Sequence, residues 1–238
     1  MVKFASLIFL TLYLQSCSTS PAYVPTTHTL PTYGEDDQIV VLGNSVAGRG
    51  IELQMAYKFN SPYYLGLSSQ YNNVGNCISC SRDKRNFNEI NFGKYLLEKK
   101  VNKEFEYTQY SSGIGYGNSE IHSTAIFGSG NLAKGDYLRS FIQYSSGNKS
   151  KYFESGYSAR LSGIYFISYS EYDNDSDKDI LIFRHENVIG LFLEPAYFIR
   201  FGFENVKLET QFGSSVPLFK QDFNQEAFNL SLGLKFEY

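Results

Sequence analysis

The sequence predicts an all-β protein, an up-and-down antiparallel β-barrel of about ten strands with an apolar outer face and a polar inner face. Three observations predict this fold. The chain has 20 Tyr, 20 Phe and 20 Gly but no Trp, a composition that suits strands and turns. Apolar and polar residues alternate along its extended segments, as in strands between an apolar and a polar medium. The connections between segments alternate between short and long. The barrel is expected to occupy residues 37–238.

The N-terminus is a targeting segment rather than part of the fold. An apolar run over residues 4–14 suits the core of a signal peptide and is too short to cross a bilayer as a helix. Leu14-Gln15-Ser16-Cys17 then resembles a lipoprotein processing box, in which the cysteine sulfur receives a diacylglycerol. We expect residues 1–16 to be a signal peptide and Cys17 to be lipidated. A plain secretory signal with an incidental cysteine is the alternative.

Residues 17–36 are expected to form a lipidated, extended linker. Pro21, Pro25 and Pro31 occur among several Thr and Ser residues, a composition that favours an extended chain with few internal hydrogen bonds. The stretch is long enough to tether a lipid loosely to a barrel. His28 lies in it and is expected to be a solvated side chain.

Ten extended segments follow this linker. Segments 87–97 and 104–116 alternate less regularly than the others, which predicts a β-bulge or a shifted register there. The predicted boundaries of the ten segments are 38–47, 49–59, 63–72, 87–97, 104–116, 136–146, 151–169, 187–201, 204–215 and 227–238.

The last segment shows the alternation most clearly. Leu232 and Leu234 fall on its apolar face, whereas Lys235 falls on its polar face. Its final aromatic residues, Phe236 and Tyr238, resemble the C-terminal strand signal that the assembly machinery reads in bacterial outer-membrane barrels. We expect this segment to pair with 204–215 and to close the barrel onto 38–47.

The connections agree with the same architecture. Bacterial outer-membrane barrels have an even number of strands, short turns on the periplasmic side and long loops outside. If ten strands start on the periplasmic side, the short turns lie on the periplasmic side of the membrane. After the first hairpin, the long loops then lie on its outer side. The short turns are predicted at 59–62, 98–103, 146–150 and 201–205.

The inner face is predicted to carry charges of both signs in near balance, together with Phe141, Phe192 and Phe198. A barrel of about ten strands has little room inside, so we expect a lumen filled by side chains and ion pairs. A narrow, selective pore is the alternative. The charged residues predicted to face inward are Glu52, Lys58, Arg139, Glu154, Arg160, Glu194, Arg200, Lys207, Glu209, Lys235 and Glu237.

The chain resembles the small lipid-anchored outer-membrane β-barrel proteins of the Bacteroidota type. The matching residues are Cys17, Tyr23-Val24-Pro25, Pro31, Gly34-Glu35 and Tyr238. The resemblance implies a bacterial outer-membrane location and partners among outer-membrane lipids and the assembly and lipoprotein-sorting machinery. It brings no active site, cofactor or metal. The outer loops are expected to contact the surroundings or a surface protein partner.

Cys77 and Cys80 are expected to form a local disulfide in the first long outer loop. The Cys-x-x-Cys spacing also occurs in redox and zinc sites, but neither the strand–helix context nor a second cysteine pair is present. An oxidising compartment favours the disulfide.

An acidic stretch at 173–179 places Asp at every second position, as a calcium loop begins. Lys178 stands where such a loop has glycine, and Arg184 stands where it has glutamate. A solvated acidic loop is therefore expected, with weak surface cation binding as the alternative.

Catalysis is not expected. His122 beside Ser123, and His185 near Asp179 and Glu186, are the candidates for a hydrolase at the outer rim, but no motif surrounds either histidine. The net charge of −3 does not indicate the strongly basic surface that binds nucleic acid. We expect a structural or surface-interaction role, with a small selective channel or a barrel enzyme acting on lipid or peptide as alternatives. A soluble lipocalin-like barrel is the structural rival.

Overall fold

The computed structural model is all-β and describes most of the chain. No helix among these residues is long and apolar enough to cross a membrane. The described residues are 22–33, 38–46, 50–59, 62–74, 83–100, 105–123, 130–175, 178–185, 187–220, 223 and 225–238. The strands are β1 (Ile39–Val46), β2 (Ile51–Lys58), β3 (Tyr63–Val74), β4 (Asp83–Lys99), β5 (Phe105–Ser123), β6 (Gly130–Lys149), β7 (Phe153–Asp175), β8 (Lys178–His185), β9 (Val188–Gly202), β10 (Val206–Ser214), β11 (Val216–Pro217) and β12 (Phe228–Glu237).

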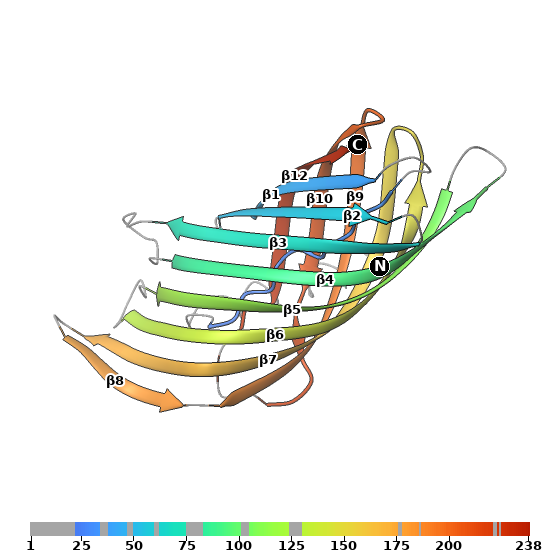
Figure 1. Cartoon of the computed structure of the whole chain (residues 1–238). Helices are drawn as coiled ribbons and strands as arrows, with labels where there is room; N and C mark the ends of the chain where they lie inside the picture. Colours follow the sequence, from blue (N-terminus) through green and yellow to red (C-terminus); the bar gives the residue numbers. More distant parts are fainter. Residues whose placement is uncertain are drawn as a thin grey trace, which may run out of the picture.

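Ten antiparallel strands close into a barrel in the order β1-β2-β3-β4-β5-β6-β7-β9-β10-β12 (Figure 1). The last strand joins the first, with Val40 opposite Glu237 and Val46 opposite Ser231. On its other side β12 pairs with β10 from Phe228 to Phe236. The prediction of a ten-stranded up-and-down barrel closed by this segment is therefore confirmed, and no barrel strand is left with an open edge.

Two strands lie outside the predicted set. The hairpin of β7 and β8 extends past the barrel, because β9 pairs with β7 only as far as Phe166 and β8 pairs with it from Tyr169 onward. The acidic stretch at 173–179 is therefore the tip of a strand hairpin rather than a loop, although residues 176–177 lie outside the described part. The second addition, β11, is a two-residue pairing with β9.

The register irregularities lie elsewhere than predicted. β4 and β5 pair without a register shift from Asp83 opposite Ile121 to Lys99 opposite Phe105, so the expected irregularity there is wrong. The register shifts instead at two other places, between β6 and β7 at Asp136/Tyr137 and between β7 and β8 at Glu171/Tyr172. Sequence alternation was weak in β4 and β5 because small and polar residues occupy both of their faces.

The barrel has two different ends, which we call the turn end and the loop end. The turn end holds the short connections β2–β3, β4–β5, β6–β7 and β9–β10. The backbone N–H groups of Gln38 and Ile39 also bond there to the carbonyl of Tyr238, at 2.8 and 3.0 Å. The loop end holds the β3–β4, β5–β6 and β10–β12 connections and the β7–β8 hairpin.

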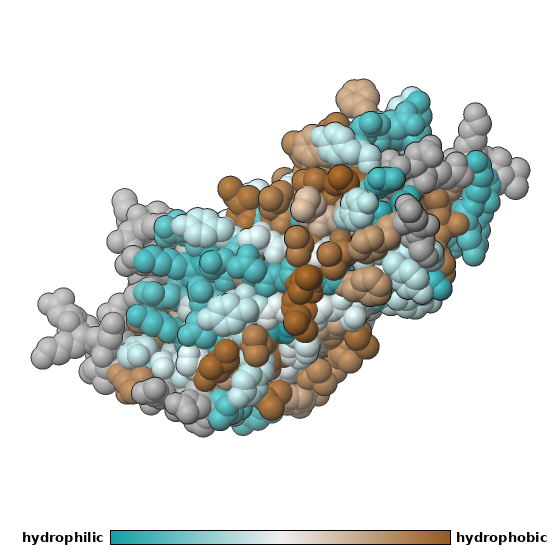
Figure 2. Space-filling model, viewed as in Figure 1, coloured by the Kyte–Doolittle hydropathy of each residue, from teal (hydrophilic) through white to brown (hydrophobic). Residues whose placement is uncertain are grey.

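The two faces of the wall differ in polarity. On β12, Leu230, Leu232 and Leu234 are exposed on the outside whereas Ser231 and Lys235 are buried inside. Ten of the eleven charged residues predicted to face inward are buried, as are the three phenylalanines. Figure 2 shows apolar residues across the middle of one outer face and hydrophilic ones toward the strand ends.

Aromatic side chains close the interior near both ends. The upper cluster, near the loop end, consists of Ala22, Tyr23, Phe87, Ala133, Tyr137, Ile164, Phe166, Tyr169, Val188, Phe192 and Phe223. The lower cluster, near the turn end, consists of Leu30, Tyr33, Val40, Ala56, Tyr64, Tyr95, Tyr107 and Phe198. Both clusters include residues that precede the first strand.

A glycine between two rings makes the upper cluster possible. Phe87, Gly117 and Tyr137 lie side by side on β4, β5 and β6. The two rings stack over the glycine with their centroids 5.9 Å apart and their planes at 12°. A Cβ at Gly117 would lie 2.6 Å from Cζ of Tyr137 and 2.8 Å from Cδ2 of Phe87, which is closer than carbon atoms approach.

Replacing this glycine tests the packing. Gly117→Ala is expected to lower the free energy of unfolding by about 1–3 kcal/mol through overpacking. The measurement is denaturant unfolding of the detergent-extracted protein. Gly43→Ala is the matched control, because a Cβ at Gly43 meets no atom within 4 Å. Equal stability of the two variants would contradict the stacked arrangement.

Candidate functional site

Residues 22–33, which we call the luminal segment, run through the inside of the barrel (Figure 1). All of them are buried. The expectation that His28 is solvated is wrong, since only 3% of it is exposed. A chain rich in proline leaves its own N–H and C=O groups unpaired, and the polar inner wall offers them partners. The same composition that suits a solvated tether therefore also suits a lumen.

The wall bonds to the backbone of the luminal segment from strands that are not neighbours. The N–H of His28 donates to Oε1 of Gln211 on β10, at 2.7 Å. From β6, Nε2 of Gln143 donates to the carbonyl of Thr29, at 2.9 Å. β6 and β10 are separated by β7 and β9. The segment therefore cross-links parts of the wall that do not pair with each other.

Arg139, on β6, binds both the wall and the luminal segment. Its guanidinium forms an ion pair with Glu89 on β4, with Nε 3.1 Å from Oε2. Its Nη2 donates to Oγ1 of Thr26 at 2.8 Å, and its Cζ lies 4.3 Å from the ring centroid of Phe87. The charge is fully buried, so the carboxylate and the threonine replace the water that it would otherwise bind.

Arg160, on β7, is the neighbouring buried cation. Its Nε donates to Oε1 of Gln143 at 2.9 Å, and its Nη1 donates to Oγ1 of Thr26 at 3.2 Å. Its Cζ lies 4.5 Å from the ring centroid of Phe141. Thr26 thus lies between the two guanidinium groups and accepts a hydrogen bond from each.

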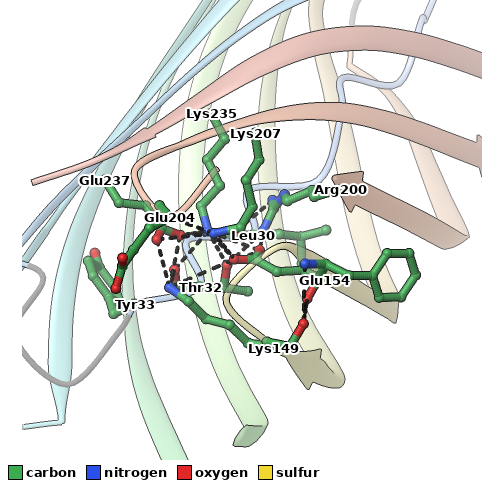
Figure 3. A network of polar contacts seen from close by, with 12 residues as sticks. Leu30, Thr32, Tyr33, Lys149, Glu154, Arg200, Glu204, Lys207, Lys235 and Glu237 are labelled. Atoms are coloured by element: carbon green, nitrogen blue, oxygen red, sulfur yellow. Dashed lines mark hydrogen bonds and ion pairs between the residues drawn. The ribbon is translucent and has the colours of Figure 1, made fainter. Parts of the chain in front are cut away.

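Glu154, on β7, is the centre of a second network nearer the turn end (Figure 3). Its carboxylate forms ion pairs with Arg200 at 3.0 Å, Lys207 at 3.1 Å and Lys235 at 3.0 Å. Oγ1 of Thr32 donates to the same carboxylate at 2.7 Å. These partners come from β9, β10, β12 and the luminal segment, so one carboxylate ties four parts of the chain together.

Two further carboxylates complete this network. Glu237 lies 2.9 Å from Nζ of Lys149 and also pairs with Lys207 and Lys235. Glu209 accepts from Nε of Arg200 at 2.5 Å. The network therefore contains four cations and three carboxylates among the described residues.

The carbonyl of Thr32 accommodates the excess of positive charge. Nζ of Lys235 donates to this oxygen at 2.8 Å and Nζ of Lys149 at 3.2 Å. Figure 3 shows both lysines converging on Thr32 and Glu154. The luminal segment is thus part of the charge balance of the lumen as well as part of its packing.

Sequence reasoning missed three parts of this site. It placed the luminal segment outside the barrel, Lys149 in a turn, and left Glu89 out of the inward set. Lys149 is 7% exposed and ends β6, whereas Glu89 is 4% exposed on β4. Strict alternation from Glu154 back across the β6–β7 turn would have pointed to Lys149, because the two residues lie opposite each other.

The other predicted residues stand apart from this site. Cys17, Cys77, Cys80 and Glu186 lie outside the described residues. His122 pairs with Leu132 on the β5–β6 hairpin, and His185 pairs with Tyr169 on the β7–β8 hairpin.

Phe236 and Tyr238 end the chain at the turn end. Tyr238 is 69% exposed. Among the described residues no group of three or more His, Cys, Asp or Glu side chains is arranged to hold a metal ion.

Comparison with known proteins adds no family to this geometry. No protein family matches the sequence, and no curated protein matches it.

The hydroxyl of Thr32 offers a test of how firmly the luminal segment is held. It donates to Glu154 and accepts from Nη1 of Arg200 at 2.8 Å. Thr32→Val keeps the shape but removes these bonds, so we expect the free energy of unfolding to fall by about 1.5–3 kcal/mol, the usual range for hydrogen bonds to charged groups. Denaturant unfolding measures the change.

Thr29→Val is the matched control. Thr29 is equally buried, yet among the described residues its Oγ1 has no hydrogen-bond partner. Its replacement is expected to leave stability unchanged or slightly higher. A loss at Thr29 as large as that at Thr32 would show that the lower network does not anchor the segment.

Proposed function

We propose that the protein is a lipid-anchored β-barrel of the bacterial outer membrane, with a filled lumen and a structural or surface-interaction role. The observation that carries the proposal is the inverted polarity of the barrel. Its buried interior holds the charges, whereas its exposed wall holds leucine, isoleucine and aromatic residues. Hydrocarbon around the wall suits this distribution, since water would leave a large apolar surface exposed.

The outer wall is apolar all the way round the barrel. Most strands present at least one large aliphatic side chain that is exposed on the outer face. Examples are Met55 on β2, Leu67 on β3, Ile90 on β4, Ile114 on β5, Ile142 on β6, Ile189 on β9, Leu208 on β10 and Leu232 on β12. An interaction patch for one protein would occupy one side only, so a continuous girdle favours lipid as the surrounding medium.

Aromatic residues near the strand ends support the same medium. Near the turn end Tyr57, Tyr63 and Phe201 are exposed, and toward the loop end Tyr71 and Phe212 are exposed. Tyrosine and phenylalanine gather at the two interfaces of outer-membrane barrels. In the proposed orientation the turn end faces the periplasm and the loop end faces outward, as the connection lengths favour.

The interior supports a closed barrel rather than a pore. The two ends of the luminal segment belong to the aromatic clusters near the two ends of the barrel, and residues between them bond to the wall. We therefore assign the proposed surface-interaction role to the connections that extend beyond the loop end of the barrel. The β7–β8 hairpin extends past the last paired residues of β7 and β9 and is the proposed surface for contacts. No catalysis is assigned to His122 or His185.

A charge placed on the wall tests the membrane environment. Leu232 is 55% exposed near the middle of β12. In lipid vesicles Leu232→Arg is expected to cost about 2–4 kcal/mol of folding free energy, the penalty for a cation at the midplane of a barrel wall. Val206→Arg, at the first residue of β10, is the control and is expected to cost about 0–1 kcal/mol near the interface. If neither variant changed the folding free energy appreciably, the result would favour water around the wall and a soluble barrel.

A conductance measurement tests the closed lumen. The purified protein in planar lipid bilayers is expected to give no discrete current steps, because the luminal segment fills the space between the two aromatic clusters. Steady single-channel currents would overturn the filled lumen and favour the small selective channel.

A further inference from the structure

The luminal segment has a defined direction through the barrel. At its start, Oγ of Ser119 donates to the carbonyl of Ala22 at 3.0 Å. The N–H of Glu226 donates to the carbonyl of Tyr23, also at 3.0 Å. Ser119 lies near the loop-end limit of β5, and Glu226 lies in the connection between β11 and β12. The segment therefore begins at the loop end.

It finishes at the other end. The hydroxyl of Tyr95 donates to the carbonyl of Tyr33 at 2.9 Å. The Tyr33 ring lies 5.5 Å from that of Tyr95, between centroids. Tyr95 is near the turn-end limit of β4, and β1 begins at this same end with Ile39. The chain thus crosses the whole barrel before its first strand.

We propose that the lipid on Cys17 lies in the outer leaflet of the membrane, on the same side as the long loops. The inference rests on the proposed function. Cys17 precedes Ala22 by five residues, a stretch that spans at most about 18 Å when fully extended. The apolar band of an outer-membrane barrel is about 25 Å tall. From Ala22, Cys17 and the glyceryl group that it carries therefore reach the interface on the loop side but not the periplasmic interface.

The lumen offers no second route to the periplasmic side. Ala22 and Tyr23 are 2% and 0% exposed, packed into the upper cluster. Below them Thr26 is held by two buried arginines and Thr32 by the lower network. A chain that doubled back toward the turn end would need space that these residues fill.

This placement has a consequence for assembly. A diacylated N-terminus is too bulky to be drawn through a filled lumen. The luminal segment must therefore be in place before the seam between β1 and β12 closes.

The test compares three single cysteines in the full-length protein on cells, with Cys77 and Cys80 changed to serine. Ser20→Cys reports the N-terminus, because it lies three residues from Cys17. Lys220→Cys reports the loop end and Lys151→Cys the turn end, and both lysines are exposed. Lys151 pairs with Glu204 at the surface, a contact of small energetic value.

A membrane-impermeant maleimide is applied to intact and to permeabilised cells. Acylated Cys17 has a thioether and does not react, and loss of palmitate label in Cys17→Ala identifies the lipid. We expect Ser20→Cys to label on intact cells as strongly as Lys220→Cys, while Lys151→Cys labels only after permeabilisation. Heat-modifiable gel migration shows that each variant is folded.

The contrary outcomes separate the two claims. If Ser20→Cys labels only after permeabilisation while Lys220→Cys labels on intact cells, the lipid is periplasmic and this inference is overturned, but the membrane barrel stands. If Lys220→Cys and Lys151→Cys label alike, the barrel does not cross the membrane as proposed and both claims fail. If no palmitate enters the wild type, the anchor itself is wrong.

Discussion

The need to pair every buried charge inside a closed barrel is the constraint on which the rest of the structure depends. Charged side chains on the inner wall lose their water when the strands close, and an unpaired charge there would cost several kcal/mol. Side chains of the wall satisfy part of this need, as Glu154 does for Arg200. The luminal segment satisfies more, with Thr26 between two arginines and the Thr32 carbonyl beside two lysines.

The luminal segment also changes how the strands of the barrel are held together. In a bare ten-stranded wall the backbone of each strand would bond only to its two neighbours, and strands further apart would be joined only by side-chain ion pairs such as Arg139 with Glu89 and Lys235 with Glu154. With the segment inside, Gln143 and Gln211 are joined across the lumen through residues 28 and 29. Aromatic residues of the segment, Tyr23 and Tyr33, complete the clusters that close both ends. Closure of the strands and filling of the lumen therefore depend on each other, because either one without the other would leave buried polar groups unpaired.

The alternation of apolar and polar residues predicted correctly which side chains face inward on most strands, but it failed on a few. A period of two fixes which residues share a face, so Lys207, Glu209 and Lys235 were placed inside from the sequence, as the structure has them. Alternation fails where both faces carry small or polar residues, as in β4, and there Glu89 was missed. It also fails where a strand leaves the barrel, since β8 pairs with one neighbour only and is not bound by the same pattern.

The sequence by itself determined the ten barrel strands, their order and most of their inward faces, because these depend on local alternation and on the lengths of connections. Only the tertiary structure decided where residues 22–33 lie. Their proline and threonine content suits an extended chain in water as well as one bonded to a polar wall. What distinguishes the two is the set of donors and acceptors that β4, β6, β7, β9, β10 and β12 bring together from positions 62 to 203 residues away in the sequence. Such partners exist only after the barrel has closed, so no local pattern could reveal them.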